Sequence, residues 1–244
     1  MLPHEYEIMH ALELRHWWFR GRRQLLVNLL KGVAGPDSRS LSILDYGCGT
    51  GGNTSVYRSF GNVIGIEPDS AAVRLAHRRG GAGYCRTNGT DLPFRDGSFD
   101  VVMASDVLEH IEHDDRAVSE IARVLFPGGS AILSVPAHRW LFSQHDTALQ
   151  HFRRYSRPAV RDLLERNRLR VSRLSYWNAA LFPVVCIQRL IGKRRGTGQP
   201  HSDTVLPPRL LNEALARLLT VESALASRIT LPWGLSLVAV AERR

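Results

Sequence analysis

A glycine-rich segment near the start of the chain constrains the fold more than any other feature. Residues 41–46 form a short, mostly apolar run that continues without a gap into glycines at alternate positions, Gly47, Gly49 and Gly51. Glycine adopts positive φ angles and has no Cβ, so this backbone can lie directly against a ligand. Glycines also mark ordinary turns, so the segment alone leaves a ligand loop and a plain turn equally open.

The end of the next predicted strand favours a ligand loop over a plain turn. Residues 63–67 are apolar and end on a carboxylate, Glu67, twenty residues beyond Gly47. In a strand–helix–strand unit, an acidic residue at this distance reaches the hydroxyls of a ribose, because the second strand ends beside the first. A short helix over 53–60 would direct its positive N-terminal end toward an anionic ligand group. Together these features predict a nucleoside site.

Strands and helices alternate beyond this unit. Apolar runs predict further strands over 84–87, 99–104, 130–135, 169–175 and 235–240, and helical spacing predicts helices over 5–30, 70–79 and 115–125, the last ending in a turn at 127–129. This alternation predicts a parallel sheet with helices on both faces and ligands at the carboxyl edge of the strands. Residues 179–230, between the last two predicted strands, are more than this alternation requires, and we expect them to form a helical lid.

Composition narrows the class of protein. The three cysteines, Cys48, Cys85 and Cys186, are far apart and without C-x-x-C spacing, so we expect neither a disulfide framework nor a metal site. The chain has no apolar run long enough to cross a membrane and opens without a secretory signal, which predicts a cytoplasmic protein. The net charge of +9 is spread over the chain, so we expect no specific nucleic-acid partner.

Residues 41–136 resemble the class I S-adenosylmethionine-dependent methyltransferases. Residues 44–51 (LDYGCGTG) are similar to the first motif of that family and residues 66–69 (IEPD) to the second, and the segments 92–100, 107–110 and 125–129 complete the pattern. The resemblance implies an α/β, Rossmann-like sheet of seven strands in the order 3-2-1-4-5-7-6, with the last strand antiparallel. It also implies S-adenosylmethionine as the cofactor, with no metal.

The resemblance carries roles over to individual residues. Asp45 would help to place the methionine end of the cofactor, Glu67 would accept hydrogen bonds from both ribose hydroxyls, and Pro68 would flank the adenine. Where the family often has Gly-Asp-Ala, this chain has Thr87-Asn88-Gly89, so the amide oxygen of Asn88 would meet the adenine amino group. The expected cofactor-binding residues are Arg22, Asp45, Gly47, Cys48, Gly49, Gly51, Glu67, Pro68, Asn88, Gly89, Thr90, Ser105 and His110.

The segment 136–155 is the first candidate for the acceptor side, because it follows the fifth strand and concentrates titratable groups. A histidine near neutral pKa is suited to removing an acceptor proton, although a single histidine is more often an ordinary surface group. The segment also resembles a His-x-x-x-x-x-His-x-Arg-Arg-Tyr-Ser run of some uncharacterised bacterial members of the family. The catalytic candidates are His110, His145, His151 and Tyr155.

The sequence therefore predicts one methyltransferase domain over 1–244: a helical cap (1–40), a cofactor-binding core (41–178), a helical lid (179–230) and the last strand (231–244). The predicted reaction is in-line transfer of a methyl group to a small, apolar or aromatic metabolite by a monomer or homodimer. A lipid-like or nucleic-acid acceptor and a catalytically silent cofactor-binding protein are the alternatives. The identity of the acceptor and the methylated atom stay open.

Overall fold

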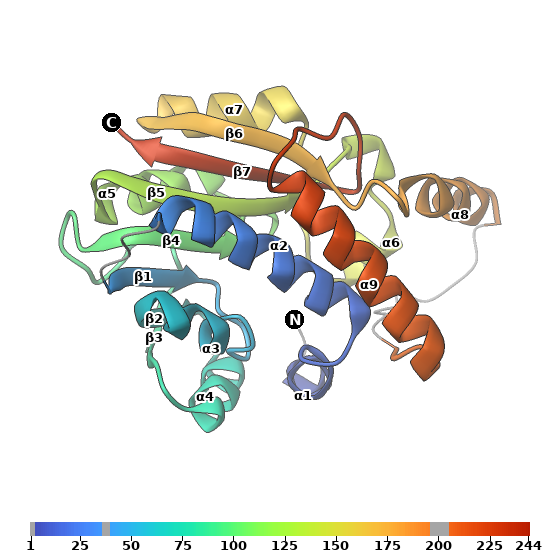
Figure 1. Ribbon diagram of the computed structural model, residues 1–244, viewed down its shortest axis with the longest axis horizontal. Helices are drawn as coiled ribbons and strands as arrows, with labels where there is room; N and C mark the ends of the chain where they lie inside the picture. Colours follow the sequence, from blue (N-terminus) through green and yellow to red (C-terminus); the bar gives the residue numbers. More distant parts are fainter. Residues whose placement is uncertain (1–2, 36–39, 196–204) are drawn as a thin grey trace.

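The computed structural model describes residues 3–35, 40–195 and 205–244 and has a mixed sheet at its centre (Figure 1). The strands are β1 (Leu41–Tyr46), β2 (Gly61–Glu67), β3 (Gly83–Arg86), β4 (Phe99–Ser105), β5 (Leu125–Pro136), β6 (Leu169–Trp177) and β7 (Ser236–Arg243). The apolar runs predicted each of these strands, with small shifts at the ends.

The strand order is β3-β2-β1-β4-β5-β7-β6. The pairs β1–β2, β2–β3, β1–β4 and β4–β5 are parallel, whereas β7 runs antiparallel to both β5 and β6. This confirms the order and the antiparallel last strand that the resemblance implied. The order reverses at β1 and β4, which is the point where an open α/β sheet leaves a crevice beyond its strands.

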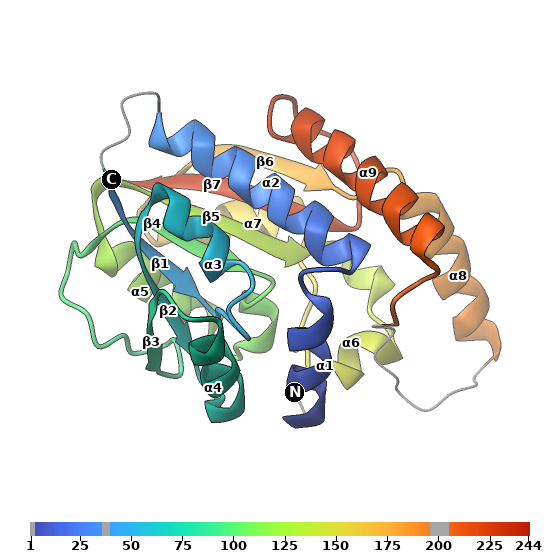
Figure 2. The same cartoon turned by 60° about the horizontal axis from the view of Figure 1, so that its bottom comes forward.

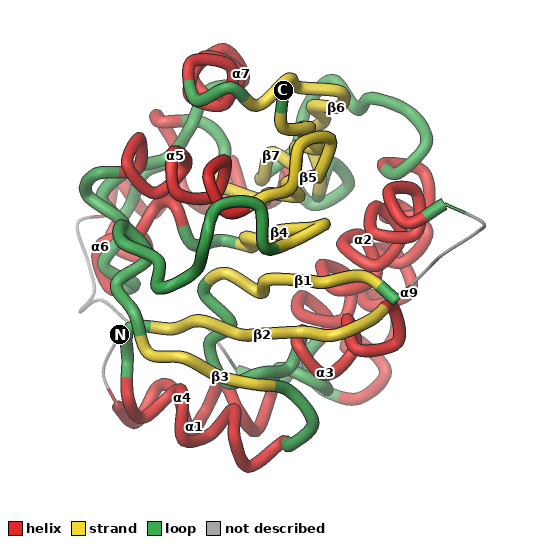
Figure 3. The backbone as a smooth tube through the Cα atoms, turned by 90° about the vertical axis from the view of Figure 1, so that its left-hand side faces the viewer, coloured by secondary structure: helices red, strands yellow, loops and turns green. Residues whose placement is uncertain are grey.

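Helices cover both faces of the sheet. They are α1 (Pro3–Leu12), α2 (Trp17–Ala34), α3 (Thr54–Tyr57), α4 (Ser70–Arg79), α5 (Asp114–Val124), α6 (Gln144–Ala148), α7 (Arg157–Arg166), α8 (Phe182–Arg195) and α9 (Arg209–Ala226), with short 3-10 turns at Arg58–Phe60, Leu108–His110 and Arg139–Leu141. Figure 3 shows α5 and α7 on one side of the sheet and α2 and α9 on the other. Each pair buries its own hydrophobic cluster against the strands.

The turn predicted at 127–129 lies inside β5 and does not separate it from α5. Phe99 of β4 pairs with Leu125, but Val101 pairs with Ser130, so residues between these pairs bulge out of the ladder. Gly128 adopts a φ of +79° in this bulge, a conformation that glycine accepts readily. The Pro-Gly-Gly run therefore bends the strand and does not end it.

The predicted lid contains α8 and α9. Two polar side chains of α9 are buried and form hydrogen bonds with the chain at and after the end of β6. Glu222 accepts hydrogen bonds from the backbone N–H groups of Ala179 and Ala180, and the Ser223 hydroxyl accepts one from Nε1 of Trp177. These bonds fix α9 to the chain that leaves β6. Residues 196–204 of the predicted lid, and 1–2 and 36–39 of the predicted cap, lie outside the described residues.

The first helices extend past the carboxyl ends of the strands. Figure 2 shows α1 beside α4, below the point toward which β1 runs, and α2 crossing the sheet above it. His16 caps α2, because its Nδ1 accepts the N–H of Trp18 at 3.3 Å. Among the described helices, none is both long enough and apolar enough to cross a membrane.

Candidate functional site

A cavity of about 1670 Å³ lies at the carboxyl ends of β1, β2, β4 and β5. This is larger than the roughly 300–1,000 Å³ of a pocket for one small ligand, so there is room for two. One end, here called the glycine-loop half, is walled by Gly47, Gly49, Glu67, Pro68 and Asn88. The other end, here called the histidine half, is walled by His110, His145, His151, Gln188 and Arg189.

Gly47 begins the loop that forms the first wall. Its φ is +73°, and a Cβ at this position would lie 2.4 Å from Cγ2 of Val107. The N–H groups of Gly47 and Cys48 both donate to the Ile66 carbonyl at 2.9 Å, which ties the loop to the end of β2. Only glycine satisfies both the positive φ and the close approach, so the sequence signal at this residue has a direct structural cause.

Glu67 ends β2 at the edge of the cavity. Its Oε2 accepts the N–H of Gly49 at 3.1 Å, and its Oε1 accepts the N–H of Asp69 at 3.3 Å. Burial raises the pKa of this carboxyl, and the two backbone donors oppose the shift. The strand therefore presents an oriented carboxylate beside the glycine loop, where the spacing predicted an acceptor for ribose hydroxyls.

Asp45 and Gly51, two of the expected cofactor-binding residues, do not wall the cavity. Asp45 is 3% exposed and accepts the Thr54 hydroxyl at 2.5 Å. Burial raises the pKa of Asp45 to about 7, and the hydrogen bond from the neutral Thr54 hydroxyl opposes this rise only in part. Gly51 turns back toward Cys48, whose carbonyl accepts its N–H at 3.0 Å. Both residues therefore stabilise the loop through contacts on the side away from the cavity.

The remaining predicted residues of the glycine-loop half reach the cavity wall; they are Cys48, Pro68, Asn88, Gly89 and Thr90. Asn88 folds its own loop, since its Oδ1 accepts the N–H of Thr90 at 3.2 Å. The Tyr46 hydroxyl donates to the Gly89 carbonyl at 2.8 Å and holds the loop against β1. The three segments that the sequence linked to one nucleoside thus lie at one edge.

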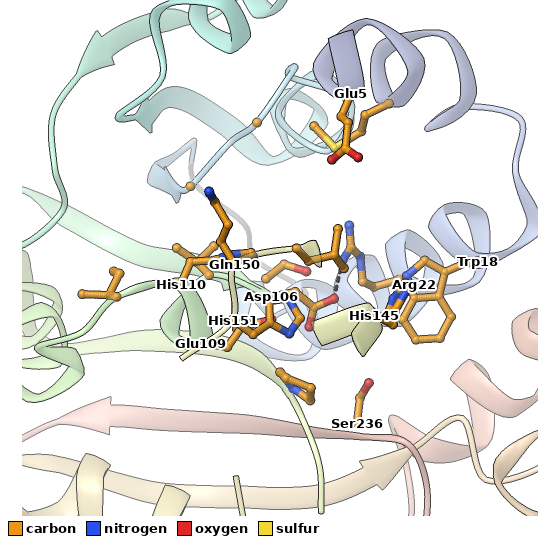
Figure 4. Close-up of a pocket in the computed structure, with 18 of the residues that line it drawn as sticks. Glu5, Trp18, Arg22, Asp106, Glu109, His110, His145, Gln150, His151 and Ser236 are labelled. Atoms are coloured by element: carbon orange, nitrogen blue, oxygen red, sulfur yellow. Dashed lines mark hydrogen bonds and ion pairs between the residues drawn. The ribbon is translucent and has the colours of Figure 1, made fainter. Parts of the chain in front are cut away.

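Arg22 and Ser105 lie where the two halves meet. Arg22 of α2 forms an ion pair with Asp106, which follows β4 (Figure 4). Ser134 donates to the other Asp106 oxygen at 2.9 Å, and Ser105 is 3.1 Å from the Ser134 hydroxyl. Asp106 adopts a φ of +53°, an uncommon conformation for a residue other than glycine. The ion pair fastens the N-terminal helices across the sheet edge.

Histidines from two segments meet in the other half. The rings of His110 and His151 are 4.6 Å apart at their centroids and lie edge to face. Burial and, to a lesser extent, the neighbouring His151 lower the pKa of His110 to about 4. Glu109 is 1% exposed, and burial together with nearby Asp106 raises its pKa well above the usual range. Figure 4 shows Glu109, His110 and His151 beside one another.

Asp146 organises the loop that carries His145 and His151. It is fully buried and accepts Nδ1 of His151 at 3.1 Å, Nε of Arg154 at 2.7 Å and Nη1 of Arg189 at 3.1 Å. Burial alone would raise its pKa, but the His151 hydrogen bond and the two guanidinium groups bring it well below the usual range. The loop is therefore fixed by one ionised carboxylate.

Three of the four catalytic candidates, His110, His145 and His151, wall the cavity, but Tyr155 does not. A catalytic role for Tyr155 stays a prediction. Its hydroxyl is buried and donates to Asp114 at 2.8 Å, and its backbone bridges to Ala137 beside the end of β5. Because this bridge sets the direction of the side chain, the phenol packs into the core and closes the histidine loop.

The comparisons with known proteins cover the chain in part. Residues 44–133 match the family described as "Methyltransferase domain". An uncharacterized methyltransferase of Mycolicibacterium gilvum is 37% identical over 130 residues, which are 51% of each chain. One of Mycobacterium marinum is 33% identical over 141 residues, which are 56% of this chain and 55% of the relative. The chain spans about half the length of the curated relatives it matches.

Solved structures match over more of the chain. A chain of the Haloferax volcanii complex that contains the Trm112 methyltransferase activator has a TM-score of 0.63 at 18% identity, covering 99% of this chain and 97% of that one. Phosphoethanolamine N-methyltransferase 2 of Haemonchus contortus, solved with S-adenosyl-L-methionine, has a TM-score of 0.60 at 16% identity, covering 89% and 52%. At such identities the likeness shows the fold alone.

Residues 44–133 belong to the methyltransferase domain family, and the strand order is that of the class I S-adenosylmethionine-dependent methyltransferase fold. Sequence reasoning missed the residues through which the N-terminal helices close the cavity. Glu13 is 7% exposed, accepts the Thr50 hydroxyl of the glycine loop and pairs with Arg79 at 2.7 Å.

Other missed residues are Tyr6 and Met9 of α1, which wall the glycine-loop half, and Asp106 and Glu109 after β4. The helical spacing of α1 indicated a helix but gave no sign of what that helix covers. A signal was available for Asp106 and Glu109, because carboxylates that follow a buried strand in a parallel sheet end at the ligand edge.

Proposed function

We propose that this methyltransferase binds S-adenosylmethionine in the glycine-loop half and transfers its methyl group to a small, apolar or aromatic acceptor in the histidine half. The observation that carries the proposal is the Glu67 carboxylate, oriented by two backbone N–H groups beside a loop at which glycine is required. The cavity extends from this carboxylate to three histidines, so both substrates fit in one space.

The residues of the glycine-loop half suit the cofactor. A Cβ at Gly47 would collide with Val107, so glycine lets the loop lie close against the residues that follow β4. Glu67 supplies carboxylate oxygens for ribose hydroxyls, and the Asn88 loop supplies an amide oxygen for an adenine amino group. S-adenosylmethionine supplies an activated methyl group on a sulfonium, which no side chain needs to attack covalently.

The chain's own task is then to position the acceptor and exclude water. Tyr6 and Met9 of α1 form part of the wall of the glycine-loop half. The ion pair between Glu13 and Arg79 holds the end of this helix near the glycine loop. Leu181, which precedes α8, and Val185 of α8 add apolar wall to the histidine half. An apolar or aromatic acceptor is favoured by these groups.

Removal of an acceptor proton falls to the histidine half. His110, His145 and His151 all face the cavity, and a neutral imidazole nitrogen can accept a proton from a phenol or an amine. Which of them takes this role depends on where the acceptor lies, and an acceptor that reacts through an electron-rich carbon needs none.

Calorimetric titration with S-adenosylmethionine tests the cofactor site. Wild-type protein is expected to bind one molecule, and Glu67→Gln to bind it about 10- to 100-fold more weakly, because hydrogen bonds to a charged group contribute about 1.5–3 kcal/mol. Glu112→Gln is the matched control, because Glu112 is exposed at the far end of the same cavity. Equal affinity of Glu67→Gln and wild type would remove Glu67 from the site.

A lipid-like acceptor is the second candidate. Val185 of α8 and the preceding Leu181 wall the cavity, whereas Val184 and Ile187 of α8 are 52% and 58% exposed. An apolar chain could therefore extend from the cavity along α8. Methyl transfer from labelled S-adenosylmethionine into a panel of small aromatic compounds and of single-chain lipids separates the two: label in the lipids alone would replace the first candidate.

A further inference from the structure

Three side chains that commonly bind metal ions come together in the histidine half. Glu109 and His110 belong to the 3-10 turn after β4, and His151 belongs to the loop after α6. Each offers one ligand atom, and these atoms all lie within 4.8 Å of one another. Figure 4 shows that the three side chains approach one another at the cavity. Small side-chain rotations would bring all three atoms around one ion.

One oxygen of the carboxylate in this group lacks a partner. Oε2 of Glu109 is buried and has no hydrogen-bond partner among the described residues. Buried polar atoms are nearly always paired, and leaving one unpaired is costly, so such an atom calls for an explanation. A cation bound at this oxygen would supply the missing interaction.

Hydrogen bonds to residues outside the group of three already orient the two imidazole rings. Nδ1 of His151 donates to the Asp146 carboxylate at 3.1 Å, and Arg154 holds the same carboxylate at 2.7 Å. An ionised carboxylate only accepts, so the proton lies on Nδ1 and Nε2 of the neutral ring carries a lone pair. His110 hydrogen-bonds the backbone of Gln150. Metal-binding histidines are typically held in this way, by a carboxylate or a backbone carbonyl on the second nitrogen.

We propose that Glu109, His110 and His151 bind one divalent transition-metal ion in the histidine half. Two imidazoles and one carboxylate suit Zn²⁺ or Fe²⁺, and a site with three protein ligands keeps a further coordination position open. The cavity lies on the open side. From the sequence we expected no metal, and the three ligands of this site come from two distant segments without a recognisable spacing.

The role of the ion, though not its binding, rests on the proposed function. An oxygen or nitrogen of the acceptor that binds at the open position would lose its proton more easily, because the ion stabilises the deprotonated form. The ion would also hold the acceptor at a fixed place relative to the glycine-loop half. The substrate class that this favours is a small molecule with a metal-binding hydroxyl or carboxylate group.

Metal binding by untagged, chelator-treated protein tests the inference, with Zn²⁺ titrated in a calorimeter and Co²⁺ followed by its visible absorption. We expect one ion per chain for wild type and at least tenfold weaker binding for Glu109→Gln and for His151→Gln. His113→Gln is the matched control, because His113 is exposed at the rim of the same cavity, and it is expected to bind as wild type does. Unchanged secondary structure by circular dichroism shows that each variant is folded.

Several results would overturn the inference. These are wild-type binding no tighter than that of Glu109→Gln and His151→Gln, and a Co²⁺ spectrum with a thiolate charge-transfer band, which would place the ion at a cysteine. Titration of the same samples with S-adenosylmethionine keeps the two proposals apart. Cofactor binding without metal binding overturns the metal site alone, whereas metal binding without cofactor binding overturns the proposed function alone.

Discussion

The two halves of the cavity are built by different means. Backbone groups within one strand–helix–strand unit form the glycine-loop half, where Gly47 and Gly49 meet the end of β2 at Ile66 and Glu67. Side chains from distant segments form the histidine half, where Asp146 joins His151, Arg154 and Arg189. The first half is therefore a local property of the sequence, and the second depends on the assembled fold.

A buried aspartate supports each half from outside the cavity wall, Asp45 in one and Asp146 in the other, and the partners of these two carboxylates differ in the same way. Asp45 under the glycine loop accepts a neutral hydroxyl, and its pKa rises to about 7. Asp146 has two guanidinium partners, and its pKa falls well below the usual range. A local unit can stabilise its loop through backbone bonds, whereas the histidine half requires ionised partners brought from elsewhere.

Asp146→Asn should have the largest effect. The substitution leaves Arg154, which is 6% exposed, without its charge partner, and breaking a buried ion pair costs about 3–5 kcal/mol. The free energy of unfolding from denaturant titration should fall by this amount, while affinity for S-adenosylmethionine stays within a few-fold.

The matched control for this prediction is Asp115→Asn. Asp115 and Arg166 form an exposed pair whose side chains are 59% and 56% accessible, so the loss should stay below about 1 kcal/mol. Equal losses in the two variants would contradict the organising role of Asp146, and a large loss of cofactor affinity in Asp146→Asn would contradict the independence of the two halves.

Asp45→Asn should change how stability depends on pH. The pKa of Asp45 is higher in the folded chain, about 7, than its ordinary value of 3.8. As the pH rises between these values the unfolded chain loses this proton first, so the contribution of Asp45 to stability falls and stays low above pH 7.

Chemical denaturation of both proteins across this pH range measures the effect. At pH 8 the asparagine variant should be more stable than wild type by about 2–4 kcal/mol, and near pH 4 the two should be similar. A wild type whose relative stability increases with pH would show that Asp45 is ionised in the folded chain.

Gly47→Ala should weaken the glycine-loop half through its backbone. The φ of +73° and the 2.4 Å approach to Val107 leave no space for a methyl group, so we expect about 1–3 kcal/mol of destabilisation and weaker cofactor binding. Gly32→Ala is the control, since nothing lies within 4 Å of its added Cβ and alanine favours a helix. If Gly47→Ala matches this control in stability and cofactor affinity, the loop does not need glycine.

Tyr155→Phe should have the smallest effect, about 1 kcal/mol of stability from the lost hydrogen bond to Asp114. Cofactor affinity and the rate of methyl transfer should stay near those of wild type. A variant that keeps its stability and loses methyl transfer would restore Tyr155 to the catalytic residues.

The two halves also differ in how far the sequence predicted them. The position of Glu67 beside the glycine loop could be predicted, because its distance from Gly47 follows from the geometry of one strand–helix–strand unit. The position of Tyr155 away from the cavity wall could not, because the direction of its side chain is set by the bridge to Ala137, which no spacing reveals. The contact of Glu13 with the glycine loop likewise depends on the path of α1 over the assembled sheet.

Strand order could not have come from spacing alone. The apolar runs located all seven strands, but the position of β7 between β5 and β6 followed from the family resemblance. The bulge at Gly128 was missed for a related reason, since Pro-Gly-Gly signals a turn equally well inside or outside a strand.

The most direct measurement is a crystal structure of the protein with S-adenosylhomocysteine. The ribose is expected to lie in the glycine-loop half with both hydroxyls donating to the Glu67 carboxylate, the adenine beside Asn88, and the sulfur directed toward the histidine half. A ligand bound elsewhere, or a ribose without contact to Glu67, would contradict the assignment of the two halves.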